Sequence, residues 1–285
     1  MLVFALLIAT IWCYKSWSYK KSTYYKVTRN TFLSSLIDKG IRGEYLIYEK
    51  LSYLERDGAQ FLFNLYIPNS KGGTTELDVV LIQKAGVYVF ESKNYSGWIF
   101  GSEDQAFWTQ TLPKGKKSQK ERFYNPIKQN HSHIKNLRSI IGESVPVHSV
   151  IVFSERCELK NVTVCSSDIA VVKRYHVGRA VKDIEDRCGN FCLDNADIER
   201  LYGQLYPYTQ VSATVKEQHI NNISKDAISM RNKTKNLKND KVKDPMLCPQ
   251  CGAPLVLRTA KKGVNSGKQF YGCSDYPSCR FIKDL

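Results

Sequence analysis

The segment Glu76-Leu-Asp-Val-Val-Leu-Ile-Gln-Lys-Ala-Gly-Val-Tyr-Val-Phe-Glu-Ser-Lys-Asn94 reads as two apolar strands joined by a short turn at Lys84-Ala85-Gly86. Three charged residues interrupt or end these strands: Asp78 lies inside the first, and Glu91 and Lys93 lie where the second ends. A carboxylate in a buried strand is costly unless it is paired or holds a metal ion. The three charges therefore indicate a functional site at this hairpin.

The geometry of a β-strand decides whether the three charges can meet. Glu91 and Lys93 are two residues apart, so their side chains point to the same face. A hairpin loop with an even number of residues places Asp78 on that face as well, whereas an odd number turns it away. Two carboxylates and one amine on a single face suit a hard metal ion with a positive group beside it.

Further pieces of sequence accompany the hairpin over about residues 35–155. In order along the chain they are Gly43-Glu44, Glu76-Leu-Asp78, Phe90-Glu-Ser-Lys-Asn-Tyr-Ser-Gly97, Asn125-Pro-Ile-Lys-Gln129 and Val150-Ile-Val-Phe-Ser154. Together they resemble the nuclease-related domain (NERD) family of the PD-(D/E)xK nuclease superfamily. The resemblance implies a restriction-endonuclease-like α/β fold, in which helices flank a mixed sheet, and cleavage of DNA that depends on Mg²⁺ (or Mn²⁺).

The resemblance also implies roles for individual residues. Asp78 and Glu91 would hold the Mg²⁺ (or Mn²⁺), and Lys93 would orient or deprotonate the attacking water. Glu44 by itself reads as an ordinary solvated carboxylate on a helix, but the resemblance implies a place in the catalytic site. Gln129 would steady Lys93 or the phosphate.

A helix is predicted to begin at Asn125-Pro126, because a capping asparagine precedes a proline at the first helical position. Gln129 falls in its first turn, at the positive end of the helix dipole. His131 and His133 lie two residues apart and face different ways on a helix, so both are expected at the surface. The apolar run 147–153 is predicted to be the strand that follows this crossover helix.

The chain of 285 residues carries a formal net charge of +15, which favours polyanionic partners such as nucleic acid or anionic lipid headgroups. The basic segment 114–122 is expected to be a loop that flanks a phosphate backbone or simply a solvated turn. Nine cysteines would suit a disulfide-rich secreted protein, but four of them have the spacing of metal ligands. Metal-bound thiolates must stay reduced, so a reducing compartment is expected.

Residues 1–14 contain no charge and are followed by aromatic residues and lysines. The run is shorter than the ~20 residues of a full membrane span, and extending it to Tyr19 gives a marginal span. The order of apolar, aromatic and basic residues favours a hydrophobic anchor helix at residues 1–20 over a buried N-terminal helix. The rest of the chain would then lie on the cytoplasmic face of the inner (plasma) membrane of a bacterial-type cell.

Cys248-Pro-Gln-Cys251 and Cys273-Ser-Asp-Tyr-Pro-Ser-Cys279 form two close cysteine pairs. Their spacing suits one tetrahedral structural Zn²⁺ bound by Cys248, Cys251, Cys273 and Cys279. A closed four-cysteine site leaves no position for a substrate, so this zinc would fold the module and do no chemistry. With Pro254-Leu-Val256 and Phe270-Tyr-Gly-Cys273, the segment resembles the C4 zinc finger of bacterial type I topoisomerases, which implies contact with DNA.

Basic residues interleave with aromatic residues in this finger, a composition typical of surfaces that bind single-stranded DNA. The residues expected to contact nucleic acid are Arg258, Lys261, Lys262, Lys268, Tyr271 and Arg280. The sequence thus predicts four parts: a membrane anchor at 1–20, a nuclease-like domain at 30–212, a basic flexible linker at 213–245 and the zinc finger at 246–285.

Two functions fit this organisation. The first is a metal-dependent nuclease that acts on DNA phosphodiester bonds, tethered to the membrane and aided by the zinc finger. The second is a non-catalytic, membrane-tethered DNA-binding protein, in which Asp78, Glu91 and Lys93 form a cross-strand ion pair on a nuclease-like scaffold. RNA stays open as a substrate, because a metal site by itself does not distinguish the two sugars.

Overall fold

The computed structural model describes residues 2–222, apart from 71, 115, 116 and 190, and parts of the C-terminal segment. The C-terminal residues described are 248, 250, 255–260, 265, 267–274, 276, 277 and 279–284. The chain divides into two compact units, Met1–His219 and Ile220–Leu285. Residues 213–222, which the composition assigns to the linker, are helical, and the remainder of that predicted linker lies outside the described residues.

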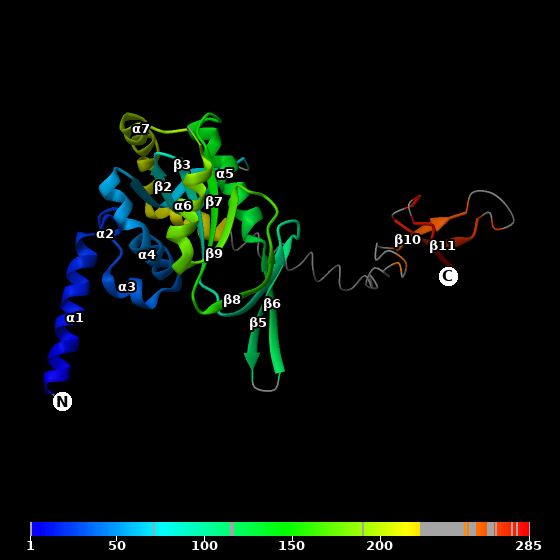
Figure 1. The fold of residues 1–285 in the computed structure, drawn as a ribbon, viewed down its shortest axis with the longest axis horizontal. Helices are drawn as coiled ribbons and strands as arrows, with labels where there is room; N and C mark the ends of the chain where they lie inside the picture. Colours follow the sequence, from blue (N-terminus) through cyan, green and yellow to red (C-terminus); the bar gives the residue numbers. More distant parts are fainter. Residues whose placement is uncertain are drawn as a thin grey trace. The chain divides into compact units, whose positions relative to one another are not determined.

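A five-stranded mixed sheet forms the centre of the first unit (Figure 1). In spatial order its strands are β1 (Gln60–Pro68), β2 (Thr74–Gln83), β3 (Gly86–Lys93), β7 (Val147–Phe153) and β9 (Ile169–Lys173). The first three strands are antiparallel, whereas β3, β7 and β9 are parallel. The mixed sheet and the strand at 147–153 confirm the α/β prediction.

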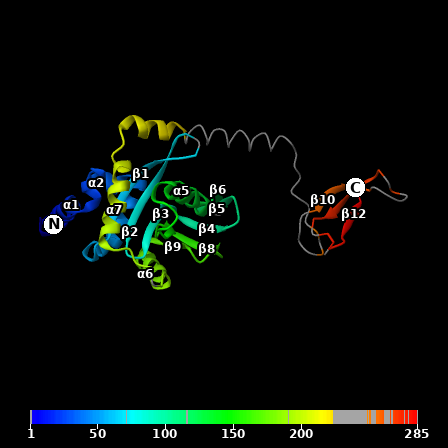
Figure 2. The same cartoon turned by 90° about the horizontal axis from the view of Figure 1, so that it is seen from above.

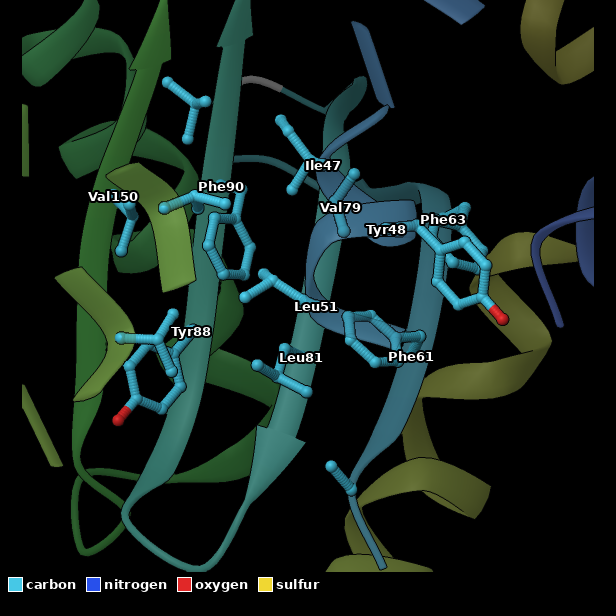
Figure 3. Close-up of a cluster of buried hydrophobic side chains, with 14 of the residues drawn as sticks. Ile47, Tyr48, Leu51, Phe61, Phe63, Val79, Leu81, Tyr88, Phe90 and Val150 are labelled. Atoms are coloured by element: carbon cyan, nitrogen blue, oxygen red, sulfur yellow. The ribbon is translucent and has the colours of Figure 1, made fainter. Parts of the chain in front are cut away.

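Helices cover both faces of this sheet, so its strands are apolar on both sides. Helices α4 (Lys39–Leu51) and α6 (Val177–Arg187) pack on one face, and α5 (Pro126–Ile141) and α7 (Asn195–Leu205) pack on the other. Figure 2 shows α5 and α6 on opposite sides of the sheet. In Figure 3, Ile47 and Leu51 of α4 lie against Phe90 of β3. Every residue of β7 is buried, as a parallel strand covered on both faces requires.

The first unit also contains three short 3₁₀ helices, namely η1 (Ser52–Asp57), η2 (Arg174–His176) and η3 (Tyr206–Thr209).

Helix α5 begins where the sequence predicts, because the Asn125 side chain accepts a hydrogen bond from the backbone N–H of Ile127, 2.9 Å away. Pro126 follows at the first helical position, where its missing N–H costs nothing.

The N-terminal segment forms α1 (Leu2–Lys21), α2 (Thr23–Thr28) and α3 (Phe32–Ile37). Tyr19 and Tyr24 are fully buried in the same core cluster as α4 and β1, and the Tyr24 ring centroid lies 4.8 Å from that of Phe63. The packed core therefore begins at the end of α1.

Earlier residues of α1 expose large apolar side chains, among them Phe4 at 70 % and Trp17 at 55 %. A helix thus forms where the sequence predicts one. Across the described residues, however, no helix combines the length and the apolar content that crossing a membrane requires. Lysines at 15, 20 and 21 make the second half of α1 polar.

A second sheet of four strands follows β3 directly in the chain. Its order is β6 (Lys117–Tyr124), β5 (Phe107–Lys114), β4 (Gly97–Ser102) and β8 (Cys157–Thr163). One face is buried through Ile99 and Trp108, which pack with Phe153. Figure 1 shows β5 and β6 as a long hairpin that extends away from the five-stranded sheet. The expectation of a loop or turn at 114–122 was wrong, since β6 occupies most of it.

The second unit contains a three-stranded antiparallel sheet. Its strands are β10 (Leu255–Thr259), β11 (Gln269–Cys273) and β12 (Ile282–Asp284), with β11 in the middle. Its described core consists of Leu255 and three cysteines, with Tyr271 and Phe281 packed against it. Such a small apolar core cannot stabilise a fold by itself.

Candidate functional site

The candidate site lies where the paired ladder of strands β2 and β3 ends. Their ladder runs from Gln83 and Gly86 to Val79 and Phe90, so the hairpin loop has two residues and the even-loop alternative holds. Continuing the register places Asp78 opposite Glu91. The Asp78 carboxylate ends the ladder by accepting a hydrogen bond of 2.8 Å from the backbone N–H of Ser92.

Glu91 and Lys93 meet side chains from α5 at this point. The Lys93 ammonium lies 2.6 Å from Glu91 Oε1 and donates to Gln129 Oε1 at 3.0 Å. On the other side, His133 Nε2 lies 3.2 Å from Glu91 Oε2, while His133 Nδ1 and the Thr75 hydroxyl are 2.7 Å apart. His133 Nε2 is close to Glu91 but forms no well-directed hydrogen bond with it.

Helix α4 delivers Glu44 to the same region because Gly43 lets the helix approach β3 closely. A Cβ atom at position 43 would lie 2.4 Å from the Ser92 hydroxyl oxygen. Glu44 Oε2 accepts a hydrogen bond of 2.9 Å from the Tyr24 hydroxyl. The side-chain amide of Asn30 donates in turn to that hydroxyl at 3.2 Å.

Burial and charged neighbours shift the pKa values of the four ionisable groups Asp78, Glu44, Glu91 and Lys93. Burial, reinforced by the Glu91 charge, raises the pKa of Asp78 to about 7, and burial together with the Asp78 charge raises the pKa of Glu44 to about 8. Burial alone would also raise the pKa of Glu91, but Lys93 and His133 outweigh it and hold that pKa below its usual value. The same pairing with Glu91 overcomes burial and raises the pKa of Lys93.

The arrangement fits a divalent cation. Asp78 and Glu91 offer hard oxygen atoms on neighbouring strands, and Mg²⁺ is commonly held by one or two carboxylates while keeping several waters. The protons that Asp78 and Glu44 hold near neutral pH are what a bound cation would displace. Lys93 lies beside this pair with its charge maintained.

We expect the affinity for Mg²⁺ or Mn²⁺ to rise steeply between pH 6 and pH 9. Because the Asp78 and Glu44 pKa values are raised to about 7 and about 8, protons compete with the metal below those values. Affinity should rise by roughly tenfold per pH unit for each proton displaced. Calorimetric titration at several pH values measures this.

The Asp78→Asn variant should lose the part of the pH dependence that comes from the Asp78 proton, while Glu143→Gln, at an exposed carboxylate, should keep the whole of it. Metal affinity that stays constant from pH 6 to pH 9 in the wild-type chain would contradict this account of the carboxylates.

His133 is the site residue that the sequence reasoning missed. The prediction that both histidines lie at the surface was wrong for His133, which is only 7 % exposed, whereas His131 is exposed. The spacing contained the signal, because Gln129 and His133 are four residues apart and share one face of α5. Thr75, which holds the His133 ring, has no comparable sequence signal.

The second unit brings together three of the four predicted zinc ligands. The sulfur atoms of Cys248, Cys273 and Cys279 all lie within 4.8 Å of one another, and all three residues are buried. The Cys248 and Cys279 sulfurs are 3.6 Å apart. A Zn–S bond of ~2.3 Å in a tetrahedron separates two sulfurs by roughly 3.8 Å, so the spacing fits zinc and is far too long for a disulfide. Cys251 lies outside the described residues.

The predicted nucleic-acid contacts of this unit are partly described. Lys268 and Arg280 are exposed, and Tyr271 is half-buried. The Arg258 guanidinium lies 5.8 Å above the Tyr276 ring and donates to the Cys273 carbonyl at 3.2 Å. Lys261 and Lys262 lie outside the described residues.

Comparison with known proteins defines the class of the molecule. Residues 39–154 match the nuclease-related domain, and residues 246–285 match the topoisomerase DNA-binding C4 zinc finger. The chain therefore belongs to the nuclease-related domain family and ends in a topoisomerase-type zinc finger.

Individual relatives agree with this division. The chain is 32 % identical over 182 residues to the uncharacterized protein pXO1-01 of Bacillus anthracis, a match that covers 64 % of this chain and 82 % of the relative. It is 44 % identical over 61 residues to DNA topoisomerase 1 of Archaeoglobus fulgidus, which covers 21 % of this chain and 9 % of that enzyme. It is also 47 % identical over 38 residues to the uncharacterized protein YrdD of Escherichia coli, covering 13 % of this chain and 18 % of YrdD. No solved structure matches the chain.

Proposed function

We propose that the protein is a divalent-metal-dependent nuclease with a restriction-endonuclease-like fold that cuts DNA phosphodiester bonds. The observation that carries the proposal is the convergence of Asp78 with Glu91 and Lys93, where Lys93 is held between Glu91 and Gln129. Membership of a nuclease-related family supports the reaction class, and the topoisomerase-type finger supports DNA as the substrate.

Asp78 and Glu91 would hold Mg²⁺ or Mn²⁺, with the Ser92 carbonyl as a further oxygen ligand. When bound, the ion polarises the scissile phosphate and lowers the pKa of a coordinated water. Lys93 keeps its proton because of Glu91. In this protonated form it would orient the attacking water and stabilise the negative charge that develops on the phosphate.

The other site residues position these groups. Gln129 fixes the direction of the Lys93 ammonium at 3.0 Å. His133, held by Thr75, restrains the second oxygen of Glu91. Glu44, held by Tyr24, would attract a second cation or help to position the first once it gives up its proton.

The zinc finger and the N-terminal helix would set where the nuclease works. The finger, folded by one Zn²⁺, would hold DNA through Arg258, Lys268, Tyr271 and Arg280 together with Lys261 and Lys262. Helix α1, with its exposed apolar side chains, would tether the chain at the cytoplasmic face of the inner membrane. Flotation of the full-length chain with anionic vesicles tests this tether, and recovery of all the protein in the vesicle-free fractions would exclude it.

The test of the nuclease proposal is cleavage of plasmid and single-stranded DNA by the full-length chain, with Mg²⁺, with Mn²⁺ and with neither ion added. We expect cutting only when an ion is present. The Asp78→Asn variant, which keeps the size of the side chain, should cut at least about a hundredfold more slowly, because it removes one of two metal-holding carboxylates.

The alternative function is a non-catalytic, tethered DNA-binding protein. The 2.6 Å contact between Lys93 and Glu91 gives it some support, because a buried ion pair can be purely structural. Salt-sensitive DNA binding without cutting under any of the three conditions would favour this function. An RNA substrate assayed in parallel decides between the two nucleic acids.

A further inference from the structure

The four-stranded sheet has a face that the core does not use. Paired residues on neighbouring strands point to the same face, and positions two apart on one strand do so too. Trp98 pairs with Thr111, which pairs with Lys120, while Phe107 pairs with Tyr124. All five therefore lie on the face opposite to the buried Trp108. The outward face of the four-stranded sheet carries Trp98, Phe100, Phe107, Lys120, Arg122 and Tyr124.

Three aromatic rings on this outward face are open to solvent. Trp98 is 42 % exposed, Phe107 is 36 % exposed and Tyr124 is 43 % exposed. The three rings do not form a purely apolar patch, because a cation lies beside two of them. The Arg122 guanidinium lies 5.1 Å from the Phe107 ring centroid, and Lys160 Nζ lies 5.8 Å from that of Trp98. Contacts of this kind restrain exposed side chains.

The charge of the outward face is positive. Lys120 and Arg122 are exposed, and Lys160 adds a third cation, which is paired with Glu158 at 2.8 Å. A polyanion is therefore the complementary partner.

The exposed aromatic rings indicate which kind of polyanion would bind this face. Bases in a duplex are stacked on each other, so their flat faces are unavailable to protein side chains. Bases in a single strand can stack on exposed aromatic rings while nearby lysine and arginine side chains contact the phosphates. An acidic protein surface would satisfy the charges but would leave the rings without a matching chemistry.

We propose that the outward face of the four-stranded sheet binds single-stranded DNA, with Trp98, Phe107 and Tyr124 stacking on bases and Lys120 and Arg122 contacting phosphates. This surface lies on the first unit and is separate from the finger residues described above. The choice of DNA rests on the proposed function, but binding is measured without cleavage, so the two proposals can fail independently.

The experiment measures binding of the full-length chain to a fluorescein-labelled 20-mer of deoxythymidine by anisotropy, with no divalent ion added. We expect the variant Trp98→Ala/Tyr124→Ala to bind this strand roughly 10- to 100-fold more weakly, with little change for a duplex of equal length. The variant Lys120→Gln/Arg122→Gln should reduce the slope of log K against log salt by about 1.4, that is about 0.7 for each lost phosphate contact.

The matched controls are Tyr175→Ala, at a ring that is 62 % exposed elsewhere on the first unit, and Arg179→Gln/Lys182→Gln on α6, where both side chains are exposed. Both controls should bind as the wild-type chain does. Because all the substituted residues are exposed, unchanged thermal unfolding should accompany each variant.

Photocrosslinking to a strand that contains 5-iododeoxyuridine gives a second, independent readout on the wild-type chain. Crosslinks at Trp98, Phe107 or Tyr124 support the proposal. Crosslinks confined to residues 246–285, wild-type affinity in the ring variant, or equal losses for single-stranded and duplex DNA would each overturn it. Cutting activity together with any of those results would leave the nuclease proposal intact and remove only this one.

Discussion

Replacing Lys93 by methionine is expected to slow DNA cleavage by a factor of roughly 10³ or more, while metal binding becomes no weaker. The expected loss follows from removing a preorganised positive charge beside the reacting phosphate. Methionine preserves the length of the buried stem. Removing a cation that lies 2.6 Å from Glu91 also removes its repulsion of a divalent ion at the carboxylates.

Slower cleavage together with undiminished metal binding would distinguish a catalytic role of Lys93 from a structural one. Single-turnover cleavage and calorimetric titration of Mn²⁺ on the same Lys93→Met preparation measure the two effects. The matched control is Lys128→Met, one position before Gln129 on α5, which should cut at close to the wild-type rate. A Lys93→Met chain that loses metal binding and folded structure along with cleavage would show that Lys93 serves as an ion-pair partner only.

Removing zinc is expected to unfold the C-terminal unit and leave the first unit folded. The described core of this unit is one leucine and three cysteines with two rings against them, so metal binding supplies most of its folding free energy. We expect one Zn²⁺ per chain by elemental analysis. After chelation, the amide resonances of residues 255–260 and 267–274 should collapse into the unfolded range.

The Cys279→Ser variant should behave like the chelated protein, whereas Cys165→Ser, at an exposed cysteine of the first unit, should keep the zinc and its dispersed spectrum. Thermal unfolding of the first unit should be the same in all four samples, because each unit is compact in itself. A finger that keeps its native resonances in the presence of a strong chelator would refute the zinc assignment.

The hairpin and its charges could be predicted because everything that places them is local. Asp78, Glu91 and Lys93 lie within sixteen residues of one another, and alternation along two strands with a two-residue loop fixes which way they point. The spacing of the cysteines likewise predicted a zinc site, and Cys248, Cys273 and Cys279 lie together in the structure, whereas Cys251 lies outside the described residues. Glu44 came only from the resemblance, and the residues alone placed Gln129 no further than the first turn of its helix. Tertiary packing brings both to the site, because Gly43 lets α4 approach β3 and α5 packs across the sheet.

The two wrong predictions, a loop or turn at 114–122 and a surface position for His133, have physical reasons as well. Strand β6 reads as a basic loop because its outward positions, such as Lys120 and Arg122, are charged and its inward positions near the hairpin tip contact no core. A strand of this kind is specified by pairing with β5 along its whole length, which composition does not reveal. His133 was missed because the two histidines were compared with each other and not with Gln129.

The burial of Tyr19 and Tyr24 determines where a shortened version of this protein can begin. Starting the chain near residue 30, to remove the exposed apolar helix, would also remove two fully buried rings and the hydroxyl that holds Glu44. Deleting a buried aromatic side chain costs about 3–5 kcal/mol, so inactivity of such a version would reflect a damaged core. A start between residues 14 and 18 discards the apolar half of α1 and keeps both tyrosines.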